Sequence, residues 1–289
     1  MPPSSAQPAA PLQLQRSYLY YRHALPVRIM HWINVIALTL LFMSGLNIFS
    51  AHPALYWGKS SYTGAGPVFQ IRALTTEDDD VIGVTRLFGR AFETTGVLGA
   101  GEGPDGEVVA RVFPSWVTVP GNRWLGMARR WHFFFAWVFV INGLCYLAYT
   151  IASRHLARDL APTGADWRSV GRSIVDHLRF RHPVGEAAKR YNVLQKLAYL
   201  AVIFVLLPLI VLMGFAMSPT LDSVIPGWVD FFGGRQSART IHFIVAWLLV
   251  AFVLIHVFEV IVSGLWNHLR SMITGRYRID VEPGNEKSR

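Results

Sequence analysis

The chain has 289 residues, of which 52% are hydrophobic and only 16% are charged, a composition too apolar for an ordinary soluble domain. The formal net charge is +9. Basic residues beside anionic lipid account for this charge, so it gives no reason to expect a nucleic-acid partner. We therefore expect the chain to lie in a membrane.

Four stretches are apolar for long enough to cross a membrane as helices. A hydrocarbon core about 30 Å thick requires roughly 20 apolar residues in a helix. The stretches that meet this requirement are residues 29–49, 131–151, 194–217 and 240–266. Their unbroken apolar runs exclude the alternating pattern of a membrane barrel. The sequence predicts an all-α integral membrane fold, a bundle of four transmembrane helices.

The remaining segments are placed around these helices. Residues 1–17 lack the basic stretch and apolar core of a signal peptide and are expected to form a disordered tail, as are residues 276–289. The four-helix domain then spans residues 18–275. Within it, residues 50–128 are rich in Gly and Pro and include the acidic run TEDDD. We expect a long irregular loop that caps the outer face, and a partly disordered loop is the alternative.

The distribution of basic residues predicts how the helices face. Basic residues outnumber acidic ones in residues 1–28, 153–192 and 267–289, and the reverse holds in residues 50–128 and 218–238. Basic segments are retained on the cytoplasmic side of a membrane. We therefore expect a multi-pass protein of the bacterial inner membrane, with both termini in the cytoplasm and the 50–128 segment outside.

Histidines are the unusual residues of these helices, because an ionisable group inside a membrane is costly and invites a functional explanation. His242 and His256 lie 14 residues apart in the fourth helix, which is nearly four turns. Both therefore leave the same face, about 21 Å apart along the axis. His31 begins the first helix at the level of His256, and His132 begins the second at the level of His242.

Two facing pairs of histidines, His31 with His256 and His132 with His242, suit the two axial positions of a haem iron inside a helical bundle. No CxxCH motif is present, so covalent haem is excluded. A single histidine in a span is more often a hydrogen bond between helices, but four histidines at two matched levels are harder to explain in that way. Zinc prefers a compact cluster of mixed ligands, and a proton relay prefers carboxylates within the helices.

Other residues near these levels are candidates for contacts with the porphyrin. Gly45 and Gly143 lie on the histidine faces of the first two helices, where a small residue leaves room for a flat macrocycle. Haem propionates are anions, and an arginine binds a carboxylate through two parallel hydrogen bonds. The arginines near the helix ends are Arg28 on the inner side and Arg129, Arg130 and Arg239 on the outer side. The alternative for each is contact with lipid headgroups.

Several short motifs together resemble a known family. LPVRIMHWIN opens the first helix, RRWHFFFAW the second and YNVLQK the third, and two histidines 14 residues apart follow in the fourth. In this order they resemble the di-haem cytochrome b561-like membrane subunits of formate dehydrogenase, NiFe hydrogenase and thiosulfate reductase. The resemblance covers roughly residues 18–275. It implies two b haems, with His132 and His242 binding the outer one and His31 and His256 the inner one.

The resemblance also implies a quinone site near the inner haem. Asn192 and Gln195 in YNVLQK match amides that open the third helix of formate dehydrogenase members, and an amide can hydrogen-bond a quinone carbonyl. Glu259 follows His256 by three residues and could take a proton from quinol. The alternatives are helix capping for the two amides and an ordinary interfacial position for the carboxylate.

In that family the membrane subunit connects the quinone pool to a redox subunit on the outer side. We therefore expect an electron-transfer subunit of an oxidoreductase. The segment HPALYWG resembles the thiosulfate-reductase-like cytochromes, which implies a molybdopterin oxidoreductase as the periplasmic partner. The alternative is a self-contained haem oxidoreductase that acts on a small diffusible species such as superoxide, with quinone as co-substrate. The sequence leaves open whether the chain forms an oligomer.

Overall fold

The computed structural model describes residues 17–61, 64–121, 123–179, 189 and 191–280. Of the tails predicted at residues 1–17 and 276–289, residues 1–16 and 281–289 lie outside the described residues. The chain divides into two compact units. One unit comprises residues 29–155 and 198–256, and the other comprises residues 1–28, 156–197 and 257–289.

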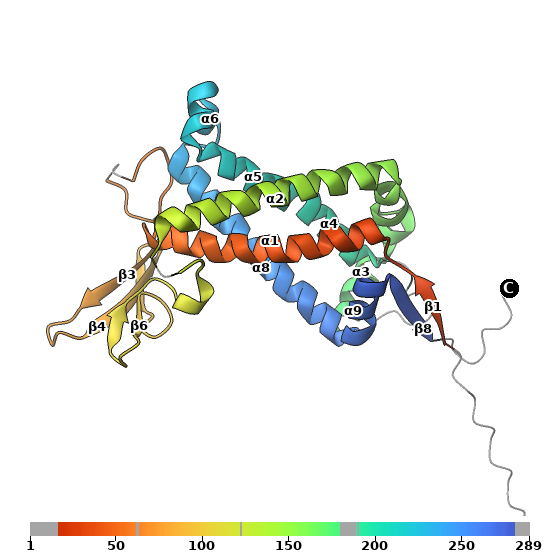
Figure 1. Ribbon diagram of the computed structural model, residues 1–289, viewed down its shortest axis with the longest axis horizontal. Helices are drawn as coiled ribbons and strands as arrows, with labels where there is room; N and C mark the ends of the chain where they lie inside the picture. The colour runs from red at the N-terminus through yellow and green to blue at the C-terminus, as the bar shows by residue number, and fades with distance from the viewer. Residues whose placement is uncertain (1–16, 62–63, 122, 180–188, 190, 281–289) are drawn as a thin grey trace, which may run out of the picture. The chain divides into compact units, whose positions relative to one another are not determined.

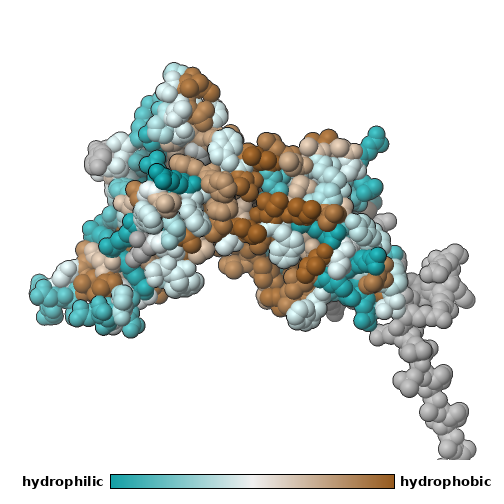
Figure 2. All heavy atoms as spheres, in the orientation of Figure 1, coloured by the Kyte–Doolittle hydropathy of each residue, from teal (hydrophilic) through white to brown (hydrophobic). Residues whose placement is uncertain are grey.

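Within the described residues, four helices are long and apolar enough to cross a membrane, which confirms the predicted four-helix membrane fold. They are α1 (Leu25–Ser50), α2 (Leu125–Ala152), the third span at Val193–Ala216 and α8 (Arg235–Val262). Apolar residues cover the surface along these helices (Figure 2). A helix surrounded by lipid needs apolar side chains on its outer face as well as its inner one.

The helix ends differ from the predicted ones by a few residues. α2 begins at Leu125 rather than at 131, and α8 ends at Val262 rather than at 266. Gly264 has a φ of 111°, and this positive φ takes the backbone out of the helical region just after α8. The residues beyond it form a separate helix, α9 (Leu265–Thr274).

The third span contains a π-helical turn. It consists of α4 (Val193–Ala201), the π-helix η4 (Val202–Leu206) and α5 (Leu207–Ala216). Pro208 in the first turn of α5 has no N–H to donate, so a carbonyl in the preceding turn loses its usual helical partner. A π-turn is one way in which a helix accommodates such a loss. Two short helices, α6 (Pro219–Val224) and α7 (Trp228–Phe231), connect this span to α8.

The segment between α1 and α2, which we call the cap, is rich in strands where the sequence analysis predicts an irregular loop. Its antiparallel sheet has the order β2-β3-β4-β5, with bounds Ala54–Leu55, Phe69–Thr75, Val81–Leu87 and Arg90–Glu93. A second pair joins β6 (Ala100–Glu102) to β7 (Val108–Ala110), and the 3-10 turn η1 (Ser115–Val117) follows. The acidic run TEDDD forms the turn between β3 and β4.

An aromatic core joins the cap to the C-terminal end of α1 and the N-terminal part of α8. Phe49 of α1 and Phe243 of α8 have ring centroids 4.8 Å apart. Phe69 of β3 lies 5.5 Å from Phe243, and Phe113 lies 6.0 Å from Phe49. Burial of several aromatic rings in one cluster is a large stabilising contribution, so the cap is a packed part of this unit.

In the other unit, residues near the two ends of the chain pair with each other. β1 (Ser17–Tyr21) and β8 (Arg276–Asp280) are antiparallel, so the folded part extends past the predicted domain end at residue 275. The unit also contains the π-helical turn η2 (Leu156–Leu160), α9 and the helix α3 (Gly164–Leu178).

A capping box begins α3 and ties it to the third span. Thr163 Oγ1 accepts a hydrogen bond from the Asp166 amide, and the Asp166 carboxylate accepts one from the Thr163 amide at 2.8 Å. Lys196 Nζ of α4 donates to the same carboxylate at 2.9 Å. The Thr163 amide, followed by the Lys196 ammonium, lowers the pKa of Asp166 to about 2.

Candidate haem-binding sites

The structure brings the four predicted histidines together in the predicted pairs. His132 of α2 faces His242 of α8, with ring centroids 6.2 Å apart and ring planes at 62°. His31 of α1 faces His256 of α8, with centroids 6.5 Å apart and planes at 61°. All four belong to one unit, in which α1 and α2 run side by side and α8 crosses them (Figure 1).

The separation within each pair fits one metal ion between two imidazoles. A metal to imidazole nitrogen bond is about 2 Å long and the nitrogen lies roughly 1 Å from the ring centroid, so two rings on one ion have centroids about 6 Å apart. Among the described residues, no group of three or more His, Cys, Asp and Glu side chains comes together as a metal cluster. Two facing imidazoles are the donor set of a haem iron with two axial histidines.

In the predicted outer pair, His132 with His242, each ring contacts a backbone carbonyl of a neighbouring helix through Nδ1. His132 Nδ1 lies 3.1 Å from the Leu41 carbonyl and 3.1 Å from Ser44 Oγ, both on α1. His242 Nδ1 lies 2.9 Å from the Ile210 carbonyl of α5. A carbonyl only accepts, so each Nδ1 carries the proton and each Nε2 keeps its lone pair for a ligand. Metal-binding histidines are commonly oriented in this way.

The inner pair has a different environment. His31 Nδ1 is buried and has no hydrogen-bond partner in the described part of the chain. The His31 ring meets the Trp32 ring edge-on at 5.4 Å, and the His256 ring stacks on Phe252 at 6.0 Å. Each of these two imidazoles therefore has an aromatic ring as a neighbour.

The two predicted glycines occupy different surroundings. A Cβ added to Gly45 would lie 3.4 Å from Cε1 of His132, so Gly45 leaves room for the imidazole ring of the outer pair. A Cβ added to Gly143 would meet no atom within 4 Å, so this position borders open space. Sequence reasoning missed a third glycine, Gly214 of α5, whose added Cβ would lie 3.7 Å from Cε1 of His242. The sequence feature that could have indicated Gly214 is a glycine within a span made mostly of large apolar residues.

Residues 22–275 match the family model described as prokaryotic cytochrome b561. The chain belongs to this family. The resemblance drawn from the helix motifs is thereby confirmed, and the protein is a multi-pass membrane cytochrome of the b type. Membership implies haem b as the cofactor, and the facing imidazoles described above fit it.

Two relatives of this cytochrome b561 protein illustrate the range of the family. One is "Putative protein-methionine-sulfoxide reductase subunit YedZ1" of Azospira oryzae, 28% identical over 239 residues, which cover 83% of this chain and 89% of the relative. The other is "Probable Ni/Fe-hydrogenase B-type cytochrome subunit" of Cupriavidus necator, 26% identical over 167 residues, which cover 53% of this chain and 68% of the relative. No solved structure matches the chain.

The predicted propionate-binding arginines of the cytochrome have other contacts in the structure. Arg239 donates to the backbone carbonyls of Ala54, at 2.8 Å, and of His52, which links α8 to the cap. Arg28 donates to the carbonyl of Ile273. The two remaining candidates, Arg129 and Arg130, are exposed near the start of α2, and the Arg129 guanidinium lies 5.9 Å from the Phe133 ring centroid.

The predicted quinone-binding amides cap the start of α4. Asn192 Oδ1 accepts from the amide of Leu194 at 2.6 Å, and Gln195 Oε1 accepts from the amide of Asn192 at 3.2 Å. Both amide oxygens therefore serve the helix. Glu259 Oε1 lies 3.2 Å from Nε2 of His177, an α3 residue that sequence reasoning left outside the site.

A polar pair that was also missed, the buried Asn142 and the partly buried Asn34, lies next to His31 in the structure. Asn142 of α2 donates 2.8 Å hydrogen bonds to the Met30 carbonyl and to Asn34 Oδ1, both on α1. Met30 immediately precedes His31, and Asn34 follows His31 by about one helical turn. Polar side chains inside two apolar spans were the available signal, because such residues usually bond to one another across helices.

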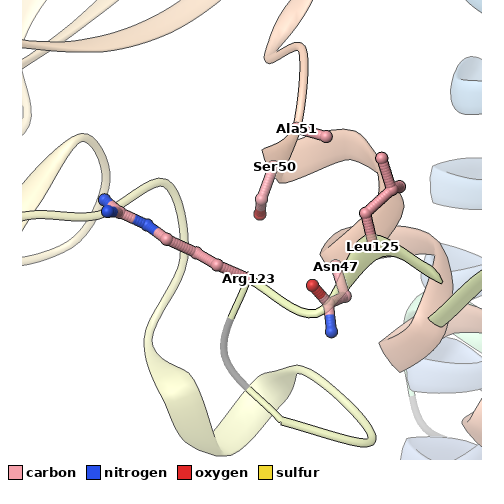
Figure 3. Close-up of a pocket in the computed structure, with 5 residues that line it drawn as sticks. All are labelled: Asn47, Ser50, Ala51, Arg123 and Leu125. Carbon is pink, nitrogen blue, oxygen red and sulfur yellow. The ribbon is translucent and has the colours of Figure 1, made fainter. Parts of the chain in front are cut away.

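A small cavity of about 130 Å³ lies at the C-terminal end of α1, bordered by residues at the end of α1 and around the start of α2 (Figure 3). Asn47 Nδ2 donates to the carbonyls of Val119 and Gly121, and Asn47 Oδ1 has no partner among the described residues. The cavity holds a few waters at most, so it is too small for a porphyrin.

Proposed function

We propose that this cytochrome binds two b haems, one between His132 and His242 and the other between His31 and His256. The observation that carries the proposal is the facing geometry of both pairs, with centroids 6.2 and 6.5 Å apart. The two ligands on α8 are 14 residues apart, which corresponds to about 21 Å along the helix. One haem-binding pair then lies towards each membrane surface.

We further propose that the cytochrome is the membrane subunit of an oxidoreductase in a bacterial inner membrane. It would carry electrons between the quinone pool and a periplasmic redox partner, for which a molybdopterin oxidoreductase remains our candidate. One relative is named as a subunit of a methionine sulfoxide reductase and another as a subunit of a hydrogenase, which supports a redox enzyme as the partner. Haem, when bound, supplies reversible one-electron chemistry, and the protein supplies ligands, spacing and docking surfaces.

Quinone is proposed to bind on the cytoplasmic side, at the start of the third span. The oxygens of Asn192 and Gln195 are held by backbone amides, so their side-chain N–H groups are the atoms available to donate to a quinone carbonyl. Oxidation of a quinol releases two electrons and two protons. The two electrons would pass one at a time to the proposed inner haem. Glu259 is proposed to accept one proton and to pass it to water through the more exposed His177, 3.2 Å away, and the second proton is proposed to leave directly to water.

The haem assignment is tested by removing each ligand and counting the haems. The purified wild-type cytochrome is expected to hold two non-covalent b haems per chain in a pyridine haemochrome assay. His132→Ala and His242→Ala should each remove the same haem, and His31→Ala and His256→Ala should each remove the other. A wild-type content of one haem, or loss of different haems from His132→Ala and His242→Ala, would overturn the pairing.

A further inference from the structure

The two outer imidazoles each meet a backbone carbonyl of a different neighbouring helix, and His132 Nδ1 also lies 3.1 Å from Ser44 Oγ. His132 Nδ1 faces the carbonyl of Leu41, and Gly45 lies four residues later on α1. His242 Nδ1 faces the carbonyl of Ile210, and Gly214 lies four residues later on α5. Each imidazole thus meets a backbone carbonyl followed, at the same spacing, by a glycine.

The spacing has a physical reason in helix geometry. Side chains of a helix lean towards its N-terminus, so the side chain of one residue lies beside the carbonyl four residues before it. That carbonyl already accepts the helical hydrogen bond, and its second lone pair is reachable from outside only if the overlying side chain is small. A glycine at the fourth position therefore opens the carbonyl to an incoming N–H group.

The distances set a limit on the side chain at each position. An added Cβ at Gly45 would lie 3.4 Å from Cε1 and 3.7 Å from Nδ1 of His132, and at Gly214 it would lie 3.7 and 4.0 Å from the same atoms of His242. These are ordinary van der Waals contacts, so a methyl group fits. A branched side chain would extend into the volume of the ring and push the imidazole off its carbonyl.

We propose that Gly45 and Gly214 are positioning residues that allow the carbonyls of Leu41 and Ile210 to fix both ligands of the outer haem as Nδ1–H tautomers. The proposal rests on the proposed ligation of that haem by His132 and His242. Because a hydrogen bond from Nδ1 makes an imidazole a stronger electron donor, the same contacts lower the midpoint potential of the outer haem. At the inner site, His31 Nδ1 has no such partner among the described residues, so this imidazole lacks the effect.

The test compares valine and alanine at the two glycines in the full-length purified cytochrome. Gly126 of α2 is the matched control, because an added Cβ there meets no atom within 4 Å. Gly45→Val and Gly214→Val are expected to raise the outer midpoint potential in a redox titration and to change the low-spin EPR signal of that haem. The inner potential should stay constant, and Gly45→Ala, Gly214→Ala and Gly126→Val should resemble the wild type.

Each alternative result is decisive. Unchanged potential and EPR signal of the outer haem in both valine variants would overturn the proposal, as would the same shift in Gly126→Val. If the valine variants lose the outer haem altogether, the alanine variants decide. Alanine variants that keep the outer haem support the limit that a methyl group fits and a branched side chain does not. Alanine variants that also lose the outer haem overturn that limit. If His132→Ala and His242→Ala remove different haems, the proposed ligation fails instead.

Discussion

At the scale of single residues, some polar atoms within the spans contact a proposed ligand or the helix that carries one. Ser44 and the Leu41 carbonyl hold His132, and Asn142 reaches across to the helix that carries His31. A polar atom in an apolar environment is costly unless it is hydrogen-bonded, so these contacts also set which faces of α1 and α2 meet.

Replacing Asn142 tests this role at the inner site. Asn142→Leu removes the bonds to the Met30 carbonyl and to Asn34 Oδ1 and should destabilise the contact of α1 with α2 by about 1 kcal/mol. We expect the inner haem to be released at a lower temperature than in the wild type, measured by absorbance during thermal denaturation in detergent. Asn34→Ala keeps the bond to Met30 and should have a smaller effect. If Asn142→Leu released the inner haem at the same temperature as the wild type, this interpretation would be contradicted.

At the scale of secondary-structure elements, the start of the third span combines a helix cap with the proposed quinone contact. The cap uses the side-chain oxygens of Asn192 and Gln195, and the proposed quinone contact uses their nitrogens. Carboxylates keep the oxygen acceptor and lack the N–H donors, and an Asp is also a good N-cap residue. The two roles can therefore be separated by isosteric substitution.

Asn192→Asp and Gln195→Glu should slow the reduction of the cytochrome by added quinol, measured by stopped-flow absorbance. A roughly tenfold decrease would correspond to the loss of about one hydrogen bond of 1.4 kcal/mol. The haem spectra and reduction by dithionite should remain unchanged, because the helix cap is retained. Arg239→Leu on the outer side is the control. Wild-type rates in both amide variants, with a loss of quinol reaction in Arg239→Leu, would place the quinone site on the opposite face.

At the scale of the whole molecule, four crossings predict that the cap and the α3 segment lie on opposite sides of the membrane. We expect Phe88→Cys in the cap to react with a membrane-impermeant maleimide in spheroplasts, and Arg172→Cys on α3 to react only after the membrane is opened. Phe88 is 77% exposed, and Arg172 is also exposed. The background variant is Cys145→Ser, which removes the native cysteine. The reverse labelling pattern would invert the topology and the side assigned to each haem.

The sequence by itself determined the four helices and the two histidine levels. In lipid, a long apolar segment can satisfy its backbone only as a helix, and a 14-residue spacing on a helix can put two rings on only one face. Both statements depend on local geometry, so the histidine pairs of α1, α2 and α8 could be predicted before any packing was known.

The tertiary structure alone decided the contacts that need a particular neighbour. Which strands pair in the cap depends on contacts between residues far apart in the sequence. The alternation of apolar and polar residues in FQIRALT and VIGVTRL is short, and the surrounding Gly and Pro residues weaken the prediction of strands there. The anchoring of His242 by the Ile210 carbonyl, and the pairing of Glu259 with His177, join residues at least 32 positions apart. The periodicity of one helix does not predict which backbone carbonyl of another helix a given side chain will contact, because this contact depends on how the helices pack.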